Sequence, residues 1–88
     1  MLRISVVGEG VGELTLRLEG RVLGPWVAEL REGCGKVLRE KRGLTLDLSE
    51  VMFASRAGLA LLLELKAQGV VLSGCSPFLT QELKAADV

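Results

Sequence analysis

The sequence contains no histidine and no tyrosine among its 88 residues. Histidine is the commonest general base near neutral pH and the commonest metal ligand, so its absence argues against most acid–base and metal-dependent enzymes. Basic and acidic residues number 11 each, which gives a formal net charge of zero. Nucleic acids and anionic membranes are bound mainly by basic surfaces. We therefore expect no catalytic site, metal or cofactor, and neither nucleic acid nor membrane as a partner.

Cysteines and long apolar runs are also scarce. Cys34 and Cys75 lack the CxxC spacing, and we expect two buried, reduced thiols, although the sequence leaves a disulfide open. No apolar run approaches the length that spans a membrane, and residues 1–5 alternate rather than forming the apolar core of a signal peptide. A chain that is 49% hydrophobic and 25% charged is typical of a folded protein. We expect one cytoplasmic domain over residues 1–88.

The first quarter of the chain has the two-residue period of β-strands. Apolar side chains alternate with polar ones over residues 2–6 and again over residues 14–18. The glycine-rich stretch between them, residues 8–12, lacks the GxGxxG spacing of a nucleotide-binding loop and leads into a strand rather than a helix. The pattern predicts a β-hairpin.

A helical period follows from Gly24-Pro25, because proline suits the first position of a helix. Apolar residues then recur at helical spacing up to Leu38, and Trp26 is expected to pack in the core or at an interface. Gly33 and Gly35 each weaken this helix by about 1 kcal/mol relative to alanine. We therefore expect its C-terminal half to bend or fray.

The second half of the chain alternates strands and helices. A strand is predicted over residues 44–48, a leucine-rich helix over residues 56–68 with Gly69 as its C-cap, and a strand over residues 70–72. The last strand is apolar on both faces, which predicts cover on both sides. Ser76-Pro77 opens a final helix over residues 78–86, whose expected apolar contacts are Phe78, Leu79 and Leu83.

The predicted order is therefore β-β-α-β-α-β-α. Each strand–helix–strand unit favours a parallel pair with a right-handed crossover, so we predict an α/β fold with a small mixed sheet covered by helices. The residues expected in the core are Leu16, Leu18, Leu30, Leu46, Leu48, Phe53, Leu61, Leu62, Leu65 and Val71.

Residues 44–59, LTLDLSEVMFASRAGL, resemble the signature of the STAS family, the sulfate-transporter and anti-sigma-factor-antagonist domains. The matching features are the apolar strand, Asp47-Leu48-Ser49, Phe53 and Gly58-Leu59. In the family, Asp-Ser-Ser-Gly-Leu opens a helix, and its second serine accepts a phosphoryl group from a partner kinase. Here Ser55, Arg56 and Ala57 occupy the first three of these positions. The resemblance thus implies a STAS-like fold without phosphorylation at the family's position.

The resemblance also implies a function. We expect a non-catalytic protein–protein interaction module that is similar to an anti-sigma factor antagonist and acts in signal transduction and transcription regulation. Its implied partner is an anti-sigma factor, a serine kinase or a related signalling protein, and without the switch it would always be competent to bind. The alternatives are a small STAS subunit docked on the ATPase of a membrane transporter, and a small-molecule-binding sensor with its ligand at the C-terminal edge of the parallel strands.

The expected partner-binding residues lie on the turn and the outward face of the following helix. Ser55 is predicted to be the N-cap, whereas Arg56 opposes the helix dipole. At 3.6 residues per turn, Arg56, Leu59, Ala60 and Leu63 should form one accessible patch. Either the last helix or the mate of a homodimer could instead cover this face. The complete predicted site is Ser55, Arg56, Ala57, Gly58, Leu59, Ala60 and Leu63.

Overall fold

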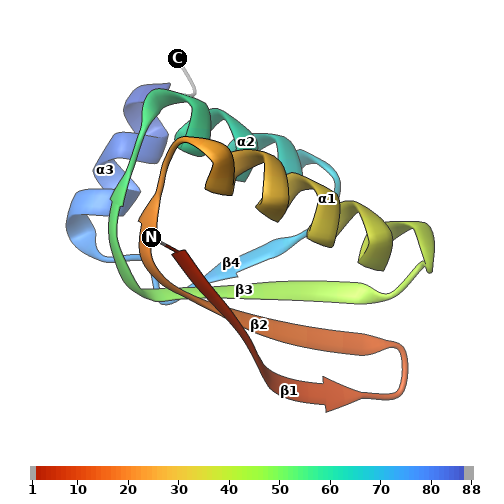
Figure 1. Ribbon diagram of the computed structural model, residues 1–88. Coiled ribbons are helices and arrows are strands. Elements are labelled where there is room, and N and C mark those ends of the chain that lie inside the picture. Colours follow the sequence, from red (N-terminus) through yellow and green to blue (C-terminus); the bar gives the residue numbers. More distant parts are fainter. Residues whose placement is uncertain (1, 87–88) are drawn as a thin grey trace.

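The chain forms a four-stranded sheet with two helices packed on one face and a third beside them (Figure 1). A computed structural model describes residues 2–86. The elements are β1 (Leu2–Gly10), β2 (Glu13–Val22), α1 (Pro25–Arg39), β3 (Gly43–Ala54), α2 (Arg56–Ala67), β4 (Val71–Ser73) and α3 (Pro77–Ala86). The predicted element order and the α/β class are confirmed.

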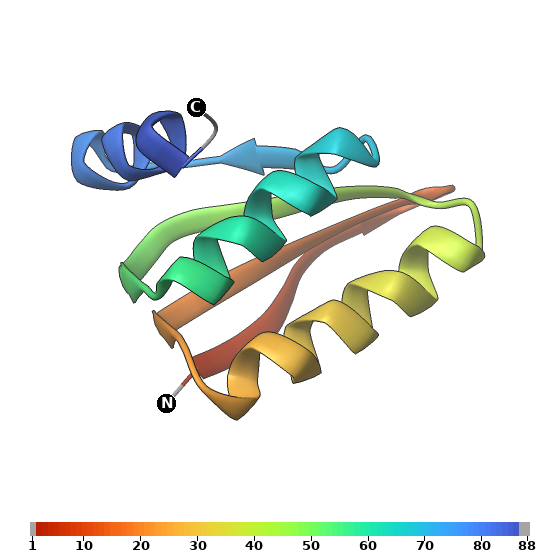
Figure 2. The same cartoon turned by 90° about the horizontal axis from the view of Figure 1, so that it is seen from above.

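The strands lie in the order β1-β2-β3-β4. β1 and β2 form the predicted antiparallel hairpin, whereas β2 pairs with β3 and β3 with β4 in parallel. Parallel neighbours require a crossover, and α1 and α2 supply the two crossovers on the same face of the sheet. Seen from above, α1 lies toward β1, α2 lies in the middle, and α3 lies beyond α2 on the side of β4 (Figure 2).

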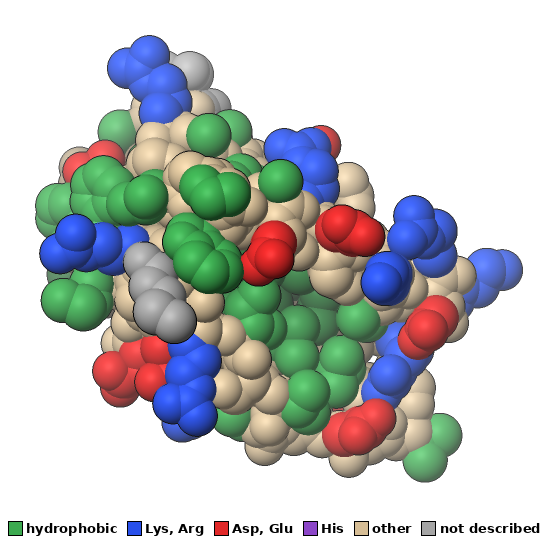
Figure 3. All heavy atoms as spheres, in the orientation of Figure 1, with side chains coloured by type: hydrophobic (Ala, Val, Ile, Leu, Met, Phe, Trp, Pro, Cys, Tyr) green, Lys and Arg blue, Asp and Glu red, His purple; other side chains and the backbone are tan. Residues whose placement is uncertain are grey.

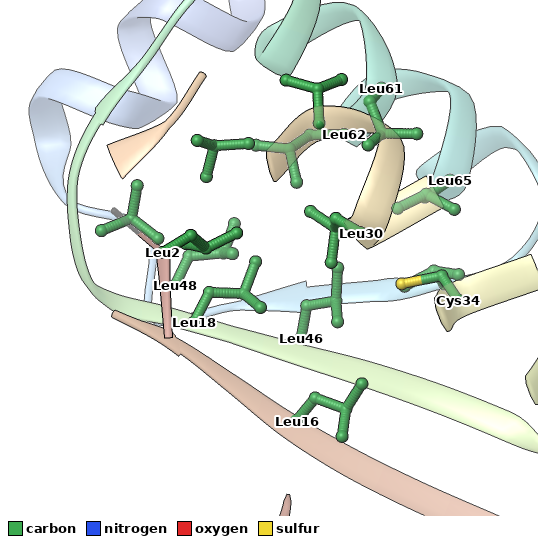
Figure 4. Packing of buried hydrophobic residues seen from close by; sticks show 14 of the residues in the cluster. Leu2, Leu16, Leu18, Leu30, Cys34, Leu46, Leu48, Leu61, Leu62 and Leu65 are labelled. Atoms are coloured by element: carbon green, nitrogen blue, oxygen red, sulfur yellow. The ribbon is translucent and has the colours of Figure 1, made fainter. Parts of the chain in front are cut away.

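The core lies between the sheet and the pair α1 and α2. Alternate leucines of β2 and β3 point toward these helices and meet leucines of α1 and α2 (Figure 4). Eight of the predicted core residues are buried: Leu16, Leu18, Leu30, Leu46, Leu48, Leu61, Leu62 and Leu65. The alternation of the strands and the period of α2 therefore located most of the core correctly.

Two predicted core residues, Phe53 and Val71, are instead exposed by 45% and 57%. Val71 pairs with Thr45 on the face of the sheet opposite the helices, so β4 is covered on one face only and the prediction of cover on both sides is wrong. Phe53 follows two register shifts in the pairing of β2 with β3. The second shift leaves Met52 without a partner in β2, so Phe53 points to the opposite face from the buried Val51.

Helices α1 and α3 differ from expectation in detail. α1 continues through Gly33 and Gly35 to Arg39, so the predicted bend or fraying is absent. Burial of the intervening Cys34 against the core supplies packing that offsets the low helix propensity of glycine. In α3, Leu79 and Leu83 are buried as predicted. Its remaining predicted contact, Phe78, is instead exposed, so this part of the prediction is wrong.

The other fold-level expectations concern the cysteines, the tryptophan and the membrane. Both cysteines are free thiols, as predicted, but only Cys34 is buried; Cys75 is half-buried, so the prediction that both are buried is wrong for Cys75. Trp26 is half-buried and packs against the core. Within residues 2–86, no helix combines the length and the apolar character needed to cross a membrane.

Candidate functional site

Asp47, the carboxylate of the signature strand, is held by two neighbours, Ser49 and Arg17. Its Oδ1 accepts a hydrogen bond from the Ser49 backbone N–H at 3.0 Å, and its Oδ2 accepts one from Arg17 Nε at 3.2 Å. The Ser49 bonds, followed by that of Arg17, lower the pKa of the Asp47 carboxyl below its usual range. A Cβ at Gly74 would lie 2.7 Å from Oδ1, so only glycine lets the loop after β4 pass this close. Asp47 therefore stabilises β3 at the point where its regular pairing with β2 ends. The loop leading to α3 passes directly beside this carboxylate.

Ser55 caps α2, as the sequence predicted. Its Oγ accepts a hydrogen bond from the Gly58 N–H at 3.1 Å and thereby satisfies one of the free donors of the first turn. The Ser55 N–H also donates to the Val22 carbonyl oxygen at 3.0 Å, and Ser55 Oγ donates to the same oxygen at 3.4 Å. The start of α2 is thus tied to the last residue of β2.

Gly58 allows this close approach. A Cβ at position 58 would collide with the Val22 carbonyl oxygen and would lie 3.1 Å from Val22 Cγ1. The glycine of the signature is therefore required by the contact between α2 and β2, and its own φ is not unusual. Together with the Ser55 hydrogen bonds, this contact fixes the direction in which α2 leaves the sheet.

The predicted patch on α2 is only partly accessible. Arg56, Ala57 and Ala60 are exposed, but Leu59 is 8% exposed and Leu63 is half-buried. Both leucines belong to or pack against the core because α3 lies along this side of α2. The last helix therefore covers the leucine side of the face, and the prediction of a contiguous accessible patch is wrong. Of the remaining predicted site residues, Gly58 is buried and Ser55 is half-buried.

A groove of about 330 Å³ opens beside the start of α2. It lies between the end of β3, the first turn of α2 and α3, and Leu59 contributes to its lining. Met52 and Phe78 are exposed by 73% and 61%, and Phe53 lies with them on the wall. Hydrophobic side chains gather over this end of the molecule, where β3 runs up to α2 beside α3 (Figure 3). We call this groove, together with the exposed first turn of α2, the docking surface.

Charged groups flank the apolar wall. Arg56 lines the groove from the first turn of α2, and Glu82 lines it from α3. Neither forms an ion pair with another side chain within residues 2–86. The docking surface therefore offers an apolar centre with one cation and one anion at its border.

Sequence reasoning missed Met52, Phe53, Phe78 and Glu82 as members of this surface. One signal was present in the sequence. Successive side chains of a strand point to opposite faces, so the three consecutive apolar residues at positions 51–53 cannot all point into the core. Nothing in the sequence indicated that the last helix, α3, would bring Phe78 and Glu82 to the end of β3.

The titratable groups of the site do not form a nucleophile and base. The Asp47 carboxylate is engaged by Ser49 and Arg17, as described above. Burial raises the pKa of the Cys34 thiol to about 11, so this thiol is protonated at neutral pH and lies inside the core. Within residues 2–86, no group of three histidine, cysteine or acidic side chains is placed to hold a metal ion.

The fold and the surface define a class: a small α/β domain that exposes the first turn of a helix beside an apolar groove. The chain belongs to the STAS family, since the family model described as "Mlab, STAS domain" matches residues 6–88. Among solved structures, it is similar to the "Anti-Sigma Factor Antagonist SpoIIAA in its Unphosphorylated Form". That comparison gives a TM-score of 0.76 and 13% sequence identity over 93% of this chain and 82% of the other, and it shows a shared fold. No match was found among curated proteins.

Proposed function

We propose that residues 1–88 form one non-catalytic interaction domain that binds a protein partner through the docking surface. The observation that carries this proposal is the exposure of Met52, Phe53 and Phe78 beside the exposed first turn of α2. Large apolar side chains that cluster on a surface commonly mark an interaction site, because water contact with them is unfavourable. Family membership supports the same function, since the surface includes the signature turn.

The proposed interface has the usual anatomy of a protein contact. Its aromatic and methionine side chains would supply the buried centre, and Arg56 and Glu82 would lie at the polar rim. Charged rim residues mainly affect the rate of association and the choice of partner, whereas apolar anchors determine most of the affinity. A partner that fits would present an apolar segment flanked by an acidic and a basic group.

We further propose that this protein lacks the phosphorylation switch of antagonist-type relatives. Ala57 is exposed in the first turn of α2, two residues after the N-cap Ser55. A phosphate there would be stabilised by the helix dipole and would add up to about two negative charges to the docking surface. Alanine has no hydroxyl to accept it. The domain would therefore remain in its binding state in the cytoplasm, where it would regulate an anti-sigma factor, a serine kinase or a related signalling protein.

A charge placed in the apolar wall tests the docking surface directly. Met52→Asp should reduce capture of the partner by at least tenfold in a pull-down or a calorimetric titration, because a buried unpaired charge is costly. Val71→Asp is the matched control, since Val71 is also an exposed apolar strand residue but lies on the open face of the sheet. Equal binding by both variants would contradict the proposed surface.

The choice of partner is tested by presenting candidates of the two protein classes in parallel. An anti-sigma-type kinase and a transporter ATPase from the same cell would each be titrated with the unmodified protein and with Met52→Asp. We expect binding to the kinase class and its loss in the variant. Variant-sensitive binding to the ATPase alone would retain the docking surface and replace the regulatory role by that of a transporter subunit.

A further inference from the structure

Strand β1 has an open edge and an apolar stripe that the proposed docking surface does not use. β1 and β4 are the two edges of the sheet. β4 has only three residues, which protects that edge, whereas β1 has nine residues and contains no proline. Within residues 2–86, β1 pairs with β2 alone. Its other side therefore presents unpaired backbone groups.

Three apolar residues of β1 face the helix side of the sheet, and two of them are not covered there. Leu2, Ile4 and Val6 pair with residues 20, 18 and 16 of β2, so they share the face of the core leucines. Leu2 is buried, but Ile4 and Val6 are exposed by 40% and 60%. Hydrophobic side chains gather in the hollow between α1 and the β1–β2 hairpin (Figure 3). An open edge beside an uncovered apolar stripe is suited to pairing with another strand.

We propose that β1 pairs antiparallel with β1 of a second copy, around a twofold axis at Ile4. In this alignment Ile4 lies opposite Ile4 of the mate, and Leu2 lies opposite Val6. These cross-strand pairs are all apolar, and they lie on the face of the sheet that carries the helices in both copies. A symmetric contact of this kind requires a surface that is complementary to itself, and residues 2–6 meet that requirement.

The charges on the other face fit the same alignment. Arg3 would lie opposite Ser5 of the mate, so no like charges are directly opposed. Arg3 pairs across the hairpin with Glu19 of its own chain, which places an opposite charge beside it. The register shift between Val6 and Gly8 ends regular pairing just outside this stretch. The segment that is regular, open and apolar is therefore the segment that the twofold alignment pairs.

The resulting dimer would have one continuous sheet with the helices of both copies on the same face. The two α1 helices would flank the joined strands and enclose Ile4 and Val6. The docking surfaces, which lie toward β4 and α3, would remain free at the two ends of the dimer. Each dimer would thus present two docking surfaces, and avidity for a dimeric partner would follow.

Sedimentation over a range of protein concentrations tests the proposed pairing. We expect the unmodified protein to shift from monomer to dimer between low micromolar and millimolar concentration. Val6→Lys should remain monomeric throughout, because it places a charge in the apolar stripe. Val71→Lys, at a strand valine of similar exposure, should dimerise like the unmodified protein. A monomer at millimolar concentration, or a dimer that Val6→Lys leaves unchanged, would overturn the proposal, provided that circular dichroism shows Val6→Lys to be folded.

The alignment is tested separately by cross-linking in a Cys75→Ser background. Residues directly opposite each other in antiparallel strands have Cα atoms about 4.5–5.5 Å apart, which suits a disulfide. Ile4→Cys should therefore give a covalent dimer under mild oxidation, and Arg3→Cys should give little. More efficient cross-linking through Arg3→Cys or Ser5→Cys than through Ile4→Cys would contradict the twofold axis at Ile4.

Discussion

Replacement of Gly58 by alanine should destabilise the protein, although the same change usually stabilises a helix. The added Cβ would collide with the Val22 carbonyl oxygen, which belongs to the backbone of β2 and cannot rotate away. That oxygen also accepts hydrogen bonds from the N–H and Oγ of Ser55. Relief of the collision requires α2 to move away from the sheet, and this movement would lengthen both bonds.

Two unfavourable contributions and one favourable contribution determine the size of the change in stability. Overpacking in a close contact costs about 1–3 kcal/mol. Weakening of the hydrogen bond from the Ser55 N–H to the Val22 carbonyl oxygen costs about 0.5–1.5 kcal/mol. The higher helix propensity of alanine returns about 1 kcal/mol. We therefore expect a net loss of roughly 0.5–3.5 kcal/mol in the free energy of unfolding, which lowers Tm by at least about 2 °C in a domain of this size.

Gly33 provides the matched control within the same chain. It lies on an exposed side of α1, and a Cβ there would have no heavy atom within 4 Å. Gly33→Ala should raise the stability by up to about 1 kcal/mol through helix propensity alone. Both variants can be followed by urea denaturation with circular dichroism and the fluorescence of Trp26. A Gly58→Ala variant as stable as the unmodified protein would refute the role assigned to the contact with Val22.

The remaining predictions concern the core, the signature carboxylate and the missing hydroxyl. Leu62 is fully buried, so its replacement by alanine should lower the free energy of unfolding by roughly 2–5 kcal/mol. A loss below about 0.5 kcal/mol in denaturant melts would contradict its place in the core. The pKa of Asp47 is lowered in the folded state, so its stabilising contribution is complete above about pH 5 and is lost as the pH falls through that pKa. Asp47→Asn should therefore flatten the acid side of the stability profile, and an unchanged slope below pH ~4 would contradict this role. A kinase that acts on antagonist domains should add no phosphate to the unmodified protein but should modify Ala57→Ser, as intact mass would show; stoichiometric phosphate on Ser55 would contradict the first expectation.

The sequence predicted the regular parts of the fold well. Strict alternation in residues 14–18 and 44–48 located two buried strand faces, and the leucine period of α2 located the helix face that meets them. Local chemistry was equally informative for Ser55, whose role as N-cap depends on its neighbours in the first turn. These features are local or periodic, so the residues themselves specify them.

The irregular parts depended on contacts between distant segments. Two register shifts, which arise from the pairing of β3 with β2, moved Phe53 out of the core and onto the docking surface. The approach of α3 buried Leu59 and brought Phe78 to the same groove. Both outcomes depend on how whole elements pack, and no period in the sequence contains that information.

Gly58 and Gly33 show which properties of a residue depend on the local sequence and which depend on the tertiary structure. By itself, the sequence determined that each lies in a helix, where glycine is unfavourable for entropic reasons. Only the tertiary structure decided that Gly58 is needed for contact with the Val22 carbonyl oxygen, whereas Gly33 has open space around it. Helix propensity is a property of the local chain, but the space available to a side chain is set by residues that lie far away in the sequence.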